Sequence, residues 1–238
     1  MRRRLLSVTA ALAGVLVMAA PARAAINQPV AIWQMNEAAG SRTMIDSSGN
    51  GINGINGAIG SHVQTGVAVT AGNNAYRFPY IRPNTPPPDP EHLVTVLSDS
   101  RLNPGTGDFA VELRMRTTHS FGNVIQKGQA GSKGGYWKFQ QPSGKISCLF
   151  RGSAGSSATG SGSVRVNDGN WHTVRCERTA SMVTMIVDGV VTGRNRNATG
   201  TIANTRPVTI AGKGTCDQVE VTCDYFSGDI DYVRIETS

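Results

Sequence analysis

Carboxylates with strand spacing are the first candidates for chemistry in this sequence. Asp229 and Asp231 flank Ile230, so on a β-strand both side chains would face the same side. Two such acids act together in retaining glycoside hydrolases, where they lie about 5 Å apart on either side of the cleaved bond. The next residues on that face are Val233 and Ile235, so the third acid of a convergent set is missing.

Motifs of other enzyme classes are missing as well. The sequence contains no G-x-S-x-G nucleophile elbow, no H-E-x-x-H metal pair and no P-loop. Residues 105–110 match G-x-G-x-x-A, but an alternating strand pattern follows them where a dinucleotide site needs a helix. We therefore identify no catalytic residues in the sequence.

Histidine is the usual acid or base of an active site, so the four histidines need an interpretation. His172 shares a strand face with Val174 and Cys176, which favours a satisfied core or edge histidine over a catalytic one. The other three lie in polar, turn-rich contexts with no nucleophile paired to them: His62, His92 and His119.

More than half of the net positive charge lies in residues 1–24, which are predicted to be removed from the mature protein. The chain has 238 residues and a formal charge of +7. Residues 1–24 carry three leading arginines, an apolar run and the sequence Ala22-Arg23-Ala24, which together predict a secretory signal peptide and a mature chain of residues 25–238. Without that segment the charge is +3, which argues against a nucleic-acid partner. No later apolar run is long enough to span a bilayer, so we expect a secreted, extracellular protein.

Four cysteines remain in the predicted mature chain, which an oxidising compartment would convert to two disulfides. Alternation places Cys148 and Cys176 on apolar strand faces, which favours a bridge between these two across strands. Cys216 and Cys223 would then close the loop over residues 214–224. A zinc site is disfavoured because no C-x-x-C spacing or histidine cluster accompanies the cysteines.

The hydrophobic period is two along most of the chain, as in Phe109 to Arg116, and we find no helical pattern. Asn-Gly and Asp-Gly pairs, which are typical of tight turns, separate the runs. The sequence therefore predicts an all-β antiparallel sandwich or barrel. The expected strands are 30–35, 75–81, 93–97, 109–116, 123–126, 136–140, 145–150, 163–166, 171–178, 183–187, 207–211 and 230–235. The proline-rich residues 79–90 and the Gly/Ser-rich residues 152–162 are expected to be loops inside one domain.

Three stretches carry a resemblance to a known family. They are residues 32–37 with 46–51 (IWQMNE and DSSGNG), 168–174 with 187–189 (DGNWHTV and VDG), and 228–235 (GDIDYVRI). In this order and spacing the chain resembles a laminin-G-like jelly roll of the concanavalin A-like lectin/glucanase superfamily, over nearly all of residues 25–238. The resemblance implies two curved antiparallel sheets of about six or seven strands, with adjacent first and last strands and a concave face that holds glycans in many relatives.

The resemblance also implies a calcium ion that ties early loops to the last strand. Asp46, Asn50 and Asp231 are the candidate ligands, with Asp231 expected on the inward side of the last strand beside Val233 and Ile235. The alternative is that Asp46 bonds the amides of its own loop and that Asp231 accepts hydrogen bonds from the backbone or an arginine.

A mixture of charged, amide and aromatic side chains on outward strand faces is a candidate carbohydrate-binding strip. Its expected members are Glu112, Arg114, Arg116, Tyr136, Lys138, Gln140, Arg175 and Glu177. The alternative is an ordinary solvated strand face, because alternation does not say which strands share a sheet.

These observations favour a secreted, noncatalytic module that binds extracellular carbohydrate, with a glycan or glycoprotein as partner. Two alternatives stay open because a fold does not determine a function. A polysaccharide hydrolase or lyase would need converging carboxylates or a Tyr/His pair, and a protein-binding adhesion module would expose an apolar patch.

Overall fold

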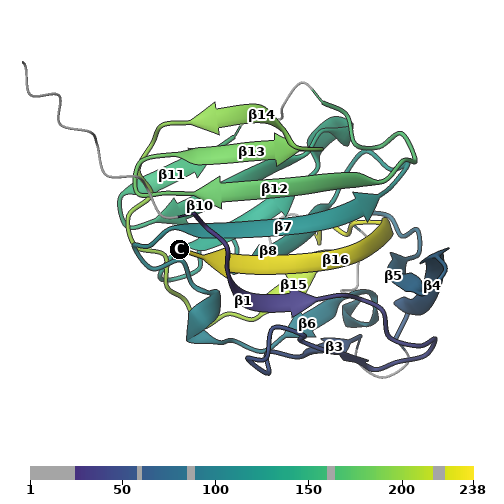
Figure 1. The fold of residues 1–238 in the computed structure, drawn as a ribbon. Helices are drawn as coiled ribbons and strands as arrows, with labels where there is room; N and C mark the ends of the chain where they lie inside the picture. The colour runs from purple at the N-terminus through teal and green to yellow at the C-terminus, as the bar shows by residue number, and fades with distance from the viewer. Residues whose placement is uncertain (1–24, 58–60, 85–88, 160–163, 217–222) are drawn as a thin grey trace, which may run out of the picture.

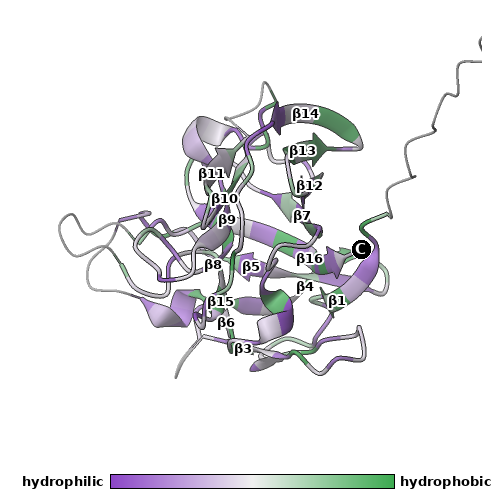
Figure 2. Ribbon diagram, turned by 90° about the vertical axis from the view of Figure 1, so that its left-hand side faces the viewer, coloured by the Kyte–Doolittle hydropathy of each residue, from purple (hydrophilic) through white to green (hydrophobic). Residues whose placement is uncertain are grey.

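The computed structural model describes residues 25–57, 61–84, 89–159, 164–216 and 223–238, so the predicted signal peptide lies outside the described part. Two antiparallel sheets pack face to face (Figures 1 and 2). The first, here called the β7 sheet, has the order β14-β13-β12-β7-β16-β5-β4, and β1 also pairs with β16. The second, the β9 sheet, has the order β11-β10-β9-β8-β15-β6-β3-β2. The predicted all-β jelly-roll sandwich is confirmed.

The strands of the β7 sheet are β1 (Gln28–Trp33), β4 (Gln64–Thr70), β5 (Asn73–Phe78), β7 (Phe109–Arg116), β12 (His172–Arg178), β13 (Val183–Val187), β14 (Val190–Asn195) and β16 (Gly228–Thr237). Those of the β9 sheet are β2 (Thr43–Met44), β3 (Gly54–Asn56), β6 (Val94–Val96), β8 (Asn123–Lys127), β9 (Tyr136–Gln140), β10 (Ser147–Gly152), β11 (Gly155–Ala158) and β15 (Val208–Ile210). Three single-turn 3-10 helices join them: η1 (Pro90–His92), η2 (Ser100–Leu102) and η3 (Pro142–Gly144). Among the described residues, no helix has the length and apolar character to cross a membrane.

The last strand, β16, organises the β7 sheet. It pairs with β7 along one side, and along the other with β5 at its start and β1 at its end. The expected adjacency of the first and last strands is therefore present. Residues 229–230 and 233–237 of β16 thus have neighbours on both sides, and Figure 1 shows this strand in yellow crossing the middle of the sheet.

The core lies between the sheets and is built from the inward residues of the alternating strands. Its largest fully buried aromatic residues are Trp33, Trp137, Tyr76, Phe78, Phe109, Phe139, Phe150 and Phe226. Cys148 on β10 and Cys176 on β12 form a disulfide that joins the two sheets through this core. Cys216 and Cys223 form the second disulfide, which confirms both predicted pairings.

Several expected boundaries were wrong. Residues 152–162 are not simply a loop, because β11 folds back on β10 and pairs Ser157 with Phe150. Of the expected strand 163–166, residue 163 is outside the described part, and the rest makes only an isolated bridge from Arg165 to Lys145. Strands β2, β3, β4 and β14 were not predicted, since they are short or carry polar residues without a clean alternation.

Gly54 illustrates why β3 was missed. The pair Asn53-Gly54 predicts a turn, yet Gly54 lies within β3 and is buried. A Cβ atom on this residue would lie 2.7 Å from the Met44 methyl carbon and 3.2 Å from Val94 and Val96 side-chain atoms. The glycine therefore serves close packing of neighbouring strands rather than a turn.

Candidate functional site

Five of the eight predicted binding residues lie together on the outer face of the β7 sheet. Glu112, Arg114 and Arg116 on β7 alternate with fully buried residues, so they point away from the core. On the neighbouring strand β12, Arg175 lies opposite Glu112 in the register and Glu177 lies opposite Ala110. We call these five residues the β7 strip.

The other three predicted members do not belong to this strip. Tyr136, Lys138 and Gln140 lie on β9, in the opposite sheet. The prediction of one strip containing all eight residues was therefore wrong. Alternation places each residue on a strand face, but the sheet to which a strand belongs depends on long-range pairing.

Ion pairs link the members of the β7 strip to one another and to β16. The Arg175 guanidinium lies 2.6 Å from Glu236 and 2.8 Å from Glu177. Glu112 accepts a hydrogen bond of 2.9 Å from the Tyr232 hydroxyl. Burial, together with this hydrogen bond to Glu112, raises the pKa of Tyr232 to about 12. The central charges of the strip are thus satisfied within the protein.

Asp229 lies at the end of the strip between two arginines. In the register, Asp229 on β16 is opposite Arg116 on β7 and Arg77 on β5. Arg77 binds both carboxylate oxygens, with Nε 2.8 Å from Oδ1 and Nη2 3.1 Å from Oδ2, and Arg116 Nη2 lies 2.5 Å from Oδ2. Burial by itself would raise the pKa of Asp229, but the two guanidinium groups outweigh it and lower the pKa.

Asp231 does not face inward as predicted. The register between β16 and β7 shifts between Ile230 and Tyr232, and both Ile230 and Val233 are fully buried. This bulge turns Asp231 to the outer face, where its carboxylate lies 2.5 Å from Arg114 Nη1 and 3.0 Å from Asn73 Nδ2. A one-residue bulge reverses which face the following residues occupy, and alternation in the sequence does not reveal it.

The indole of Trp171 covers the arginines of β7. The guanidinium carbons of Arg114 and Arg116 lie 4.8 Å and 4.7 Å from its ring centroid, which is cation–π distance.

His172, the residue after Trp171, is held in place by two acids: its Nδ1 lies 2.7 Å from Asp188 and its Nε2 lies 3.0 Å from Asp168. Partial burial lowers the pKa of His172, but the two carboxylates outweigh that effect and raise it. His172 is therefore a satisfied edge histidine, as predicted.

A pocket opens where the strip meets the loop after β5. We call it the Tyr80 pocket; its volume is about 310 Å³ and its lining includes Arg77, Tyr80, Arg116, Thr118, His119 and Asp229. Tyr80 is 65% exposed, and its ring stacks on His119 with centroids 4.6 Å apart and an interplanar angle of 19°. The pocket thus combines an exposed aromatic ring with two partly exposed arginines that Asp229 holds in place.

The remaining histidines differ from one another. His62 lies 3.1 Å from Asp89 at an exposed position, in keeping with a polar context. The prediction for His92 was wrong, because this residue is only 2% exposed and its Nε2 lies 2.8 Å from the Phe226 carbonyl oxygen. Burial lowers the pKa of His92. The short helix η1 turns His92 inward, which a turn-rich sequence does not indicate.

The predicted calcium ligands already have protein partners. Asp46 accepts hydrogen bonds from the amides of Ile32, Ser48 and Ile52 and from the Ser48 hydroxyl. The Asn50 amide nitrogen donates to the Val30 carbonyl oxygen at 2.9 Å. These are the contacts of the alternative interpretation, and none of the partners of Asp46 is shared with Asp231. Within the described ranges, no group of three His, Cys, Asp or Glu side chains lies close enough together to hold a metal ion.

Sequence comparison places this two-sheet architecture in a family. A family model described as concanavalin A-like lectin/glucanases superfamily, of laminin G type, matches residues 91–238. The chain belongs to this superfamily. The matched part includes β7 and β12, which carry the whole β7 strip, and also β16. Comparison with curated proteins finds no match.

Solved structures show the same fold at low sequence identity. Domain 4 of AbnA, a GH43 extracellular arabinanase from Geobacillus stearothermophilus, was solved in complex with arabinotriose. It has a TM-score of 0.62 and 16% identity, over 90% of this chain and 94% of that one. The binding domain of botulinum neurotoxin serotype D has a TM-score of 0.59 and 12% identity, over 90% of this chain and 49% of that one.

The binding domain of Paraclostridial Mosquitocidal Protein 1 gives a TM-score of 0.53 and 12% identity, over 86% of this chain and 48% of that one. The superfamily member described here therefore spans about half of the length of the two toxin binding domains. At these identities the comparison establishes a common fold.

The sequence prediction missed the residues that make the pocket. Arg77 and Tyr80 were not among the expected binding residues, and Asp229 and His119 were considered only as candidates for catalysis. A signal existed for Tyr80, since an aromatic residue next to prolines in a predicted loop has few neighbours to bury it. No local signal marks Arg77, whose partner Asp229 is 152 residues away.

Proposed function

We propose that this protein is a secreted, noncatalytic module that binds extracellular carbohydrate in the Tyr80 pocket. The observation that carries the proposal is the exposed Tyr80 ring, stacked on His119, beside the Arg77–Asp229–Arg116 group. A sugar ring has an apolar face that packs on an aromatic side chain and hydroxyl groups that pair with charged groups around it. Tyr80 and this charged group offer both kinds of contact within one pocket.

The rigidity of the charged groups supports a binding role. Asp229 is fixed by four hydrogen bonds from two guanidinium groups, and Arg116 is also covered by Trp171. Groups that are already ordered lose little conformational entropy when a ligand binds. Sugar hydroxyls would then meet a preformed surface.

The protonation state of Asp229 supports binding over acid catalysis. A general acid of a glycoside hydrolase needs a raised pKa so that it carries a proton at neutral pH. The paired arginines instead lower the pKa of Asp229, so it is a permanent acceptor at neutral pH. Its acceptor positions are taken up by the guanidinium groups, so it holds the two arginines in place as donors to sugar hydroxyls.

The comparisons support the same proposal. The arabinanase domain with the same fold was solved with arabinotriose, and the two toxin structures are binding domains by name. Two disulfides and the predicted signal peptide support a location outside the cytoplasm.

A protein-binding adhesion module is a second candidate, favoured by one observation. Leu97 and Ile55 are 73% and 50% exposed, and they line one hollow of about 360 Å³ at the β3–β6 edge of the β9 sheet. Exposed apolar residues that line a hollow are typical of contact sites between proteins.

A glycan array followed by calorimetry tests the proposed function. We expect specific glycan binding that weakens about tenfold in Tyr80→Ala, the order of effect seen when one aromatic anchor is removed. Leu97→Ala is the control, because Leu97 is also an exposed large side chain and lies directly after β6 of the other sheet. The affinity of this variant should equal that of the native protein. A blank array, or equal loss in both variants, would overturn the proposal. Release of reducing ends or unsaturated sugars from polysaccharides would move the protein to the enzyme class.

A further inference from the structure

A second and larger pocket lies far from Tyr80. It has a volume of about 540 Å³ and is enclosed by the loop before β9, the end of β10 and the segment around Thr201 and Ala203. We call it the Tyr136 pocket. Ile202 pairs with Gly105, just before β7 begins, whereas the Tyr80 pocket adjoins Arg116 at the end of β7. The two pockets therefore lie toward opposite ends of this strand.

Glycines form the walls of the Tyr136 pocket because the backbone segments approach too closely for side chains. A Cβ atom on Gly134 would lie 1.8 Å from the Ala203 carbonyl oxygen, and one on Gly135 would lie 2.1 Å from that of Arg151. Both glycines also have positive φ angles, of +87° and +84°. The result is a hollow with a smooth wall of backbone.

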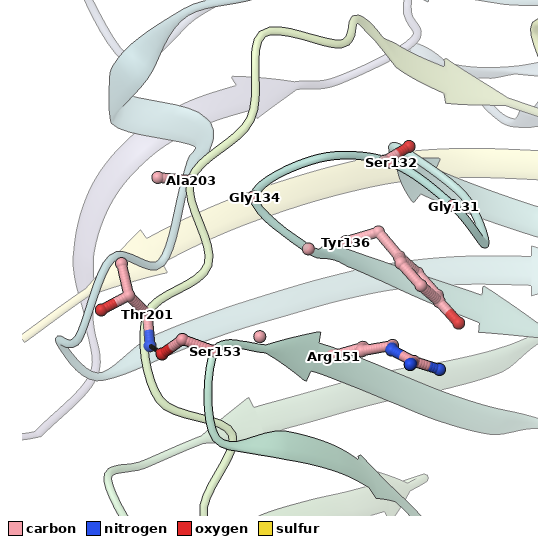
Figure 3. Close-up of a pocket in the computed structure, with 10 residues that line it drawn as sticks. Gly131, Ser132, Gly134, Tyr136, Arg151, Ser153, Thr201 and Ala203 are labelled. Atoms are coloured by element: carbon pink, nitrogen blue, oxygen red, sulfur yellow. Dashed lines mark hydrogen bonds between the residues drawn. The ribbon is translucent and has the colours of Figure 1, made fainter.

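Two polar side chains project from adjacent strands at this pocket. Tyr136 on β9 and Arg151 on β10 are paired in the register, and Figure 3 shows both pointing to the same side. Tyr136 is only 6% exposed, so its ring is held firmly, and Arg151 is exposed. In the part of the chain that the structure describes, neither the phenol nor the guanidinium has a hydrogen-bond partner.

The charge of this pocket is not compensated. Among the residues that the structure describes, its lining contains one arginine and no acidic residue, in contrast to the Tyr80 pocket, where Asp229 neutralises part of the charge. The remaining polar side chains of the lining are hydroxyls, from Ser132, Ser153 and Thr201. A ligand that fills the pocket therefore meets one fixed positive charge surrounded by hydroxyl and backbone groups.

We propose that the Tyr136 pocket binds a sugar acid, a pyranose that carries a carboxylate. Guanidinium and carboxylate form a planar pair with two charge-assisted hydrogen bonds, which is stronger than a contact between neutral groups. The Tyr136 hydroxyl and the serine and threonine hydroxyls then pair with the sugar hydroxyls. The volume lies in the range of about 300–1,000 Å³ of small-molecule sites and far exceeds that of an inorganic anion. This inference does not depend on the Tyr80 pocket.

The test compares methyl β-D-glucuronoside with methyl β-D-glucoside, which differ at one carboxylate, by amide NMR titration of the native protein. We expect the glucuronoside to shift the amide signals around Gly134, Gly135 and Arg151 in a saturable way, with an affinity of about millimolar order for a ligand of this size. The glucoside should bind at least about tenfold more weakly. Equal binding of both sugars, or shifts away from these residues, would overturn the proposal.

Variants separate this pocket from general charge and from the Tyr80 pocket. Arg151→Gln should weaken glucuronoside binding about tenfold and Tyr136→Phe a few-fold, while both keep the native melting temperature. Arg194→Gln, an exposed arginine on β14, and Tyr80→Ala should bind the glucuronoside as the native protein does. If acetate or an acidic peptide binds in the pocket as well as the glucuronoside does, the site recognises carboxylates in general and the sugar-acid proposal fails.

Discussion

Arg116 and Asp229 occupy paired positions of β7 and β16, with Arg116 Nη2 2.5 Å from Asp229 Oδ2. Arg77 binds the same carboxylate from the other side, so three neighbouring strands meet in one ion-pair group. The side chain of Asp229 is only 7% exposed, while the side chains of Arg116 and Arg77 are 34% and 44% exposed. The buried carboxylate thus needs the two arginines to compensate its charge, whereas the arginines are also hydrated by solvent.

Replacing Asp229 by Asn should therefore destabilise the protein in a pH-dependent way. We expect a loss of about 1–3 kcal/mol at pH 7, less than for a fully buried pair because the arginines reach solvent. Since the folded pKa of Asp229 is lowered, its contribution is present above the unfolded value of about 4 and is lost as the pH falls through the folded value. Urea unfolding of both proteins at pH 7 and pH 3 measures this, and an equal difference at the two pH values would contradict it.

His172 should contribute stability that depends on pH in the opposite sense. Asp188 and Asp168 raise its folded pKa, so the contribution is complete below the unfolded value of about 6.5 and is lost as the pH rises through the folded value. Relative to His172→Asn, the native protein should be more stable at pH 5.5 than at pH 8.5. Thermal unfolding at the two pH values measures the difference, and His62→Asn, at an exposed position, is the control. A difference that stays constant or grows with pH would contradict the ion pairs.

Lys127 should make stability increase with pH on the alkaline side. Its ammonium is buried beneath the segment 204–206 and donates to the Ser98 hydroxyl and to the carbonyl oxygens of Asn204 and Arg206. Burial lowers its pKa to about 8. Between this value and the unfolded value of about 10.4 the unfolded chain binds the extra proton, so the stability contributed by Lys127 rises with pH.

The variant Lys127→Met isolates this effect, because methionine has a similar length and no titrating group. The free energy of unfolding of the native protein minus that of the variant should increase from pH 7.5 to pH 10. Denaturant unfolding at several pH values provides the measurement. A flat difference would mean that Lys127 keeps an ordinary pKa in the folded protein.

Asp46 should stabilise its loop without calcium. Three backbone amides and a hydroxyl donate to its carboxylate, so Asp46→Ala should cost about 2 kcal/mol. Asp99→Ala removes a carboxylate with an exposed partner, Arg101, and should cost less. We expect the native melting temperature to be the same in a chelator and in added calcium. Binding heat and a rise in melting temperature with calcium would instead support the metal site implied by the family resemblance.

The alternating sequence pattern predicted the cysteine pairing correctly, because the pairing depends on which strand faces hold the cysteines. Cys148 and Cys176 each lie among alternating apolar residues, so both thiols had to enter the core between the sheets. The bulge in β16 shows the limit of the same argument. The extra residue between Ile230 and Val233 rotates Asp231 to the outer face, and nothing in the local sequence indicates this bulge.

The sequence by itself determined that this is an all-β protein with two disulfides, a charged face and a turn at Asp188-Gly189. These properties follow from the order of apolar and polar residues over short stretches, which local backbone geometry translates directly into strand faces. The tertiary structure alone decided which faces meet: it separated Tyr136, Lys138 and Gln140 from the β7 strip and placed Arg77 against Asp229. Strand pairing joins residues more than 100 positions apart, and its energy depends on the whole sheet, so the binding surfaces appear only once the chain is folded.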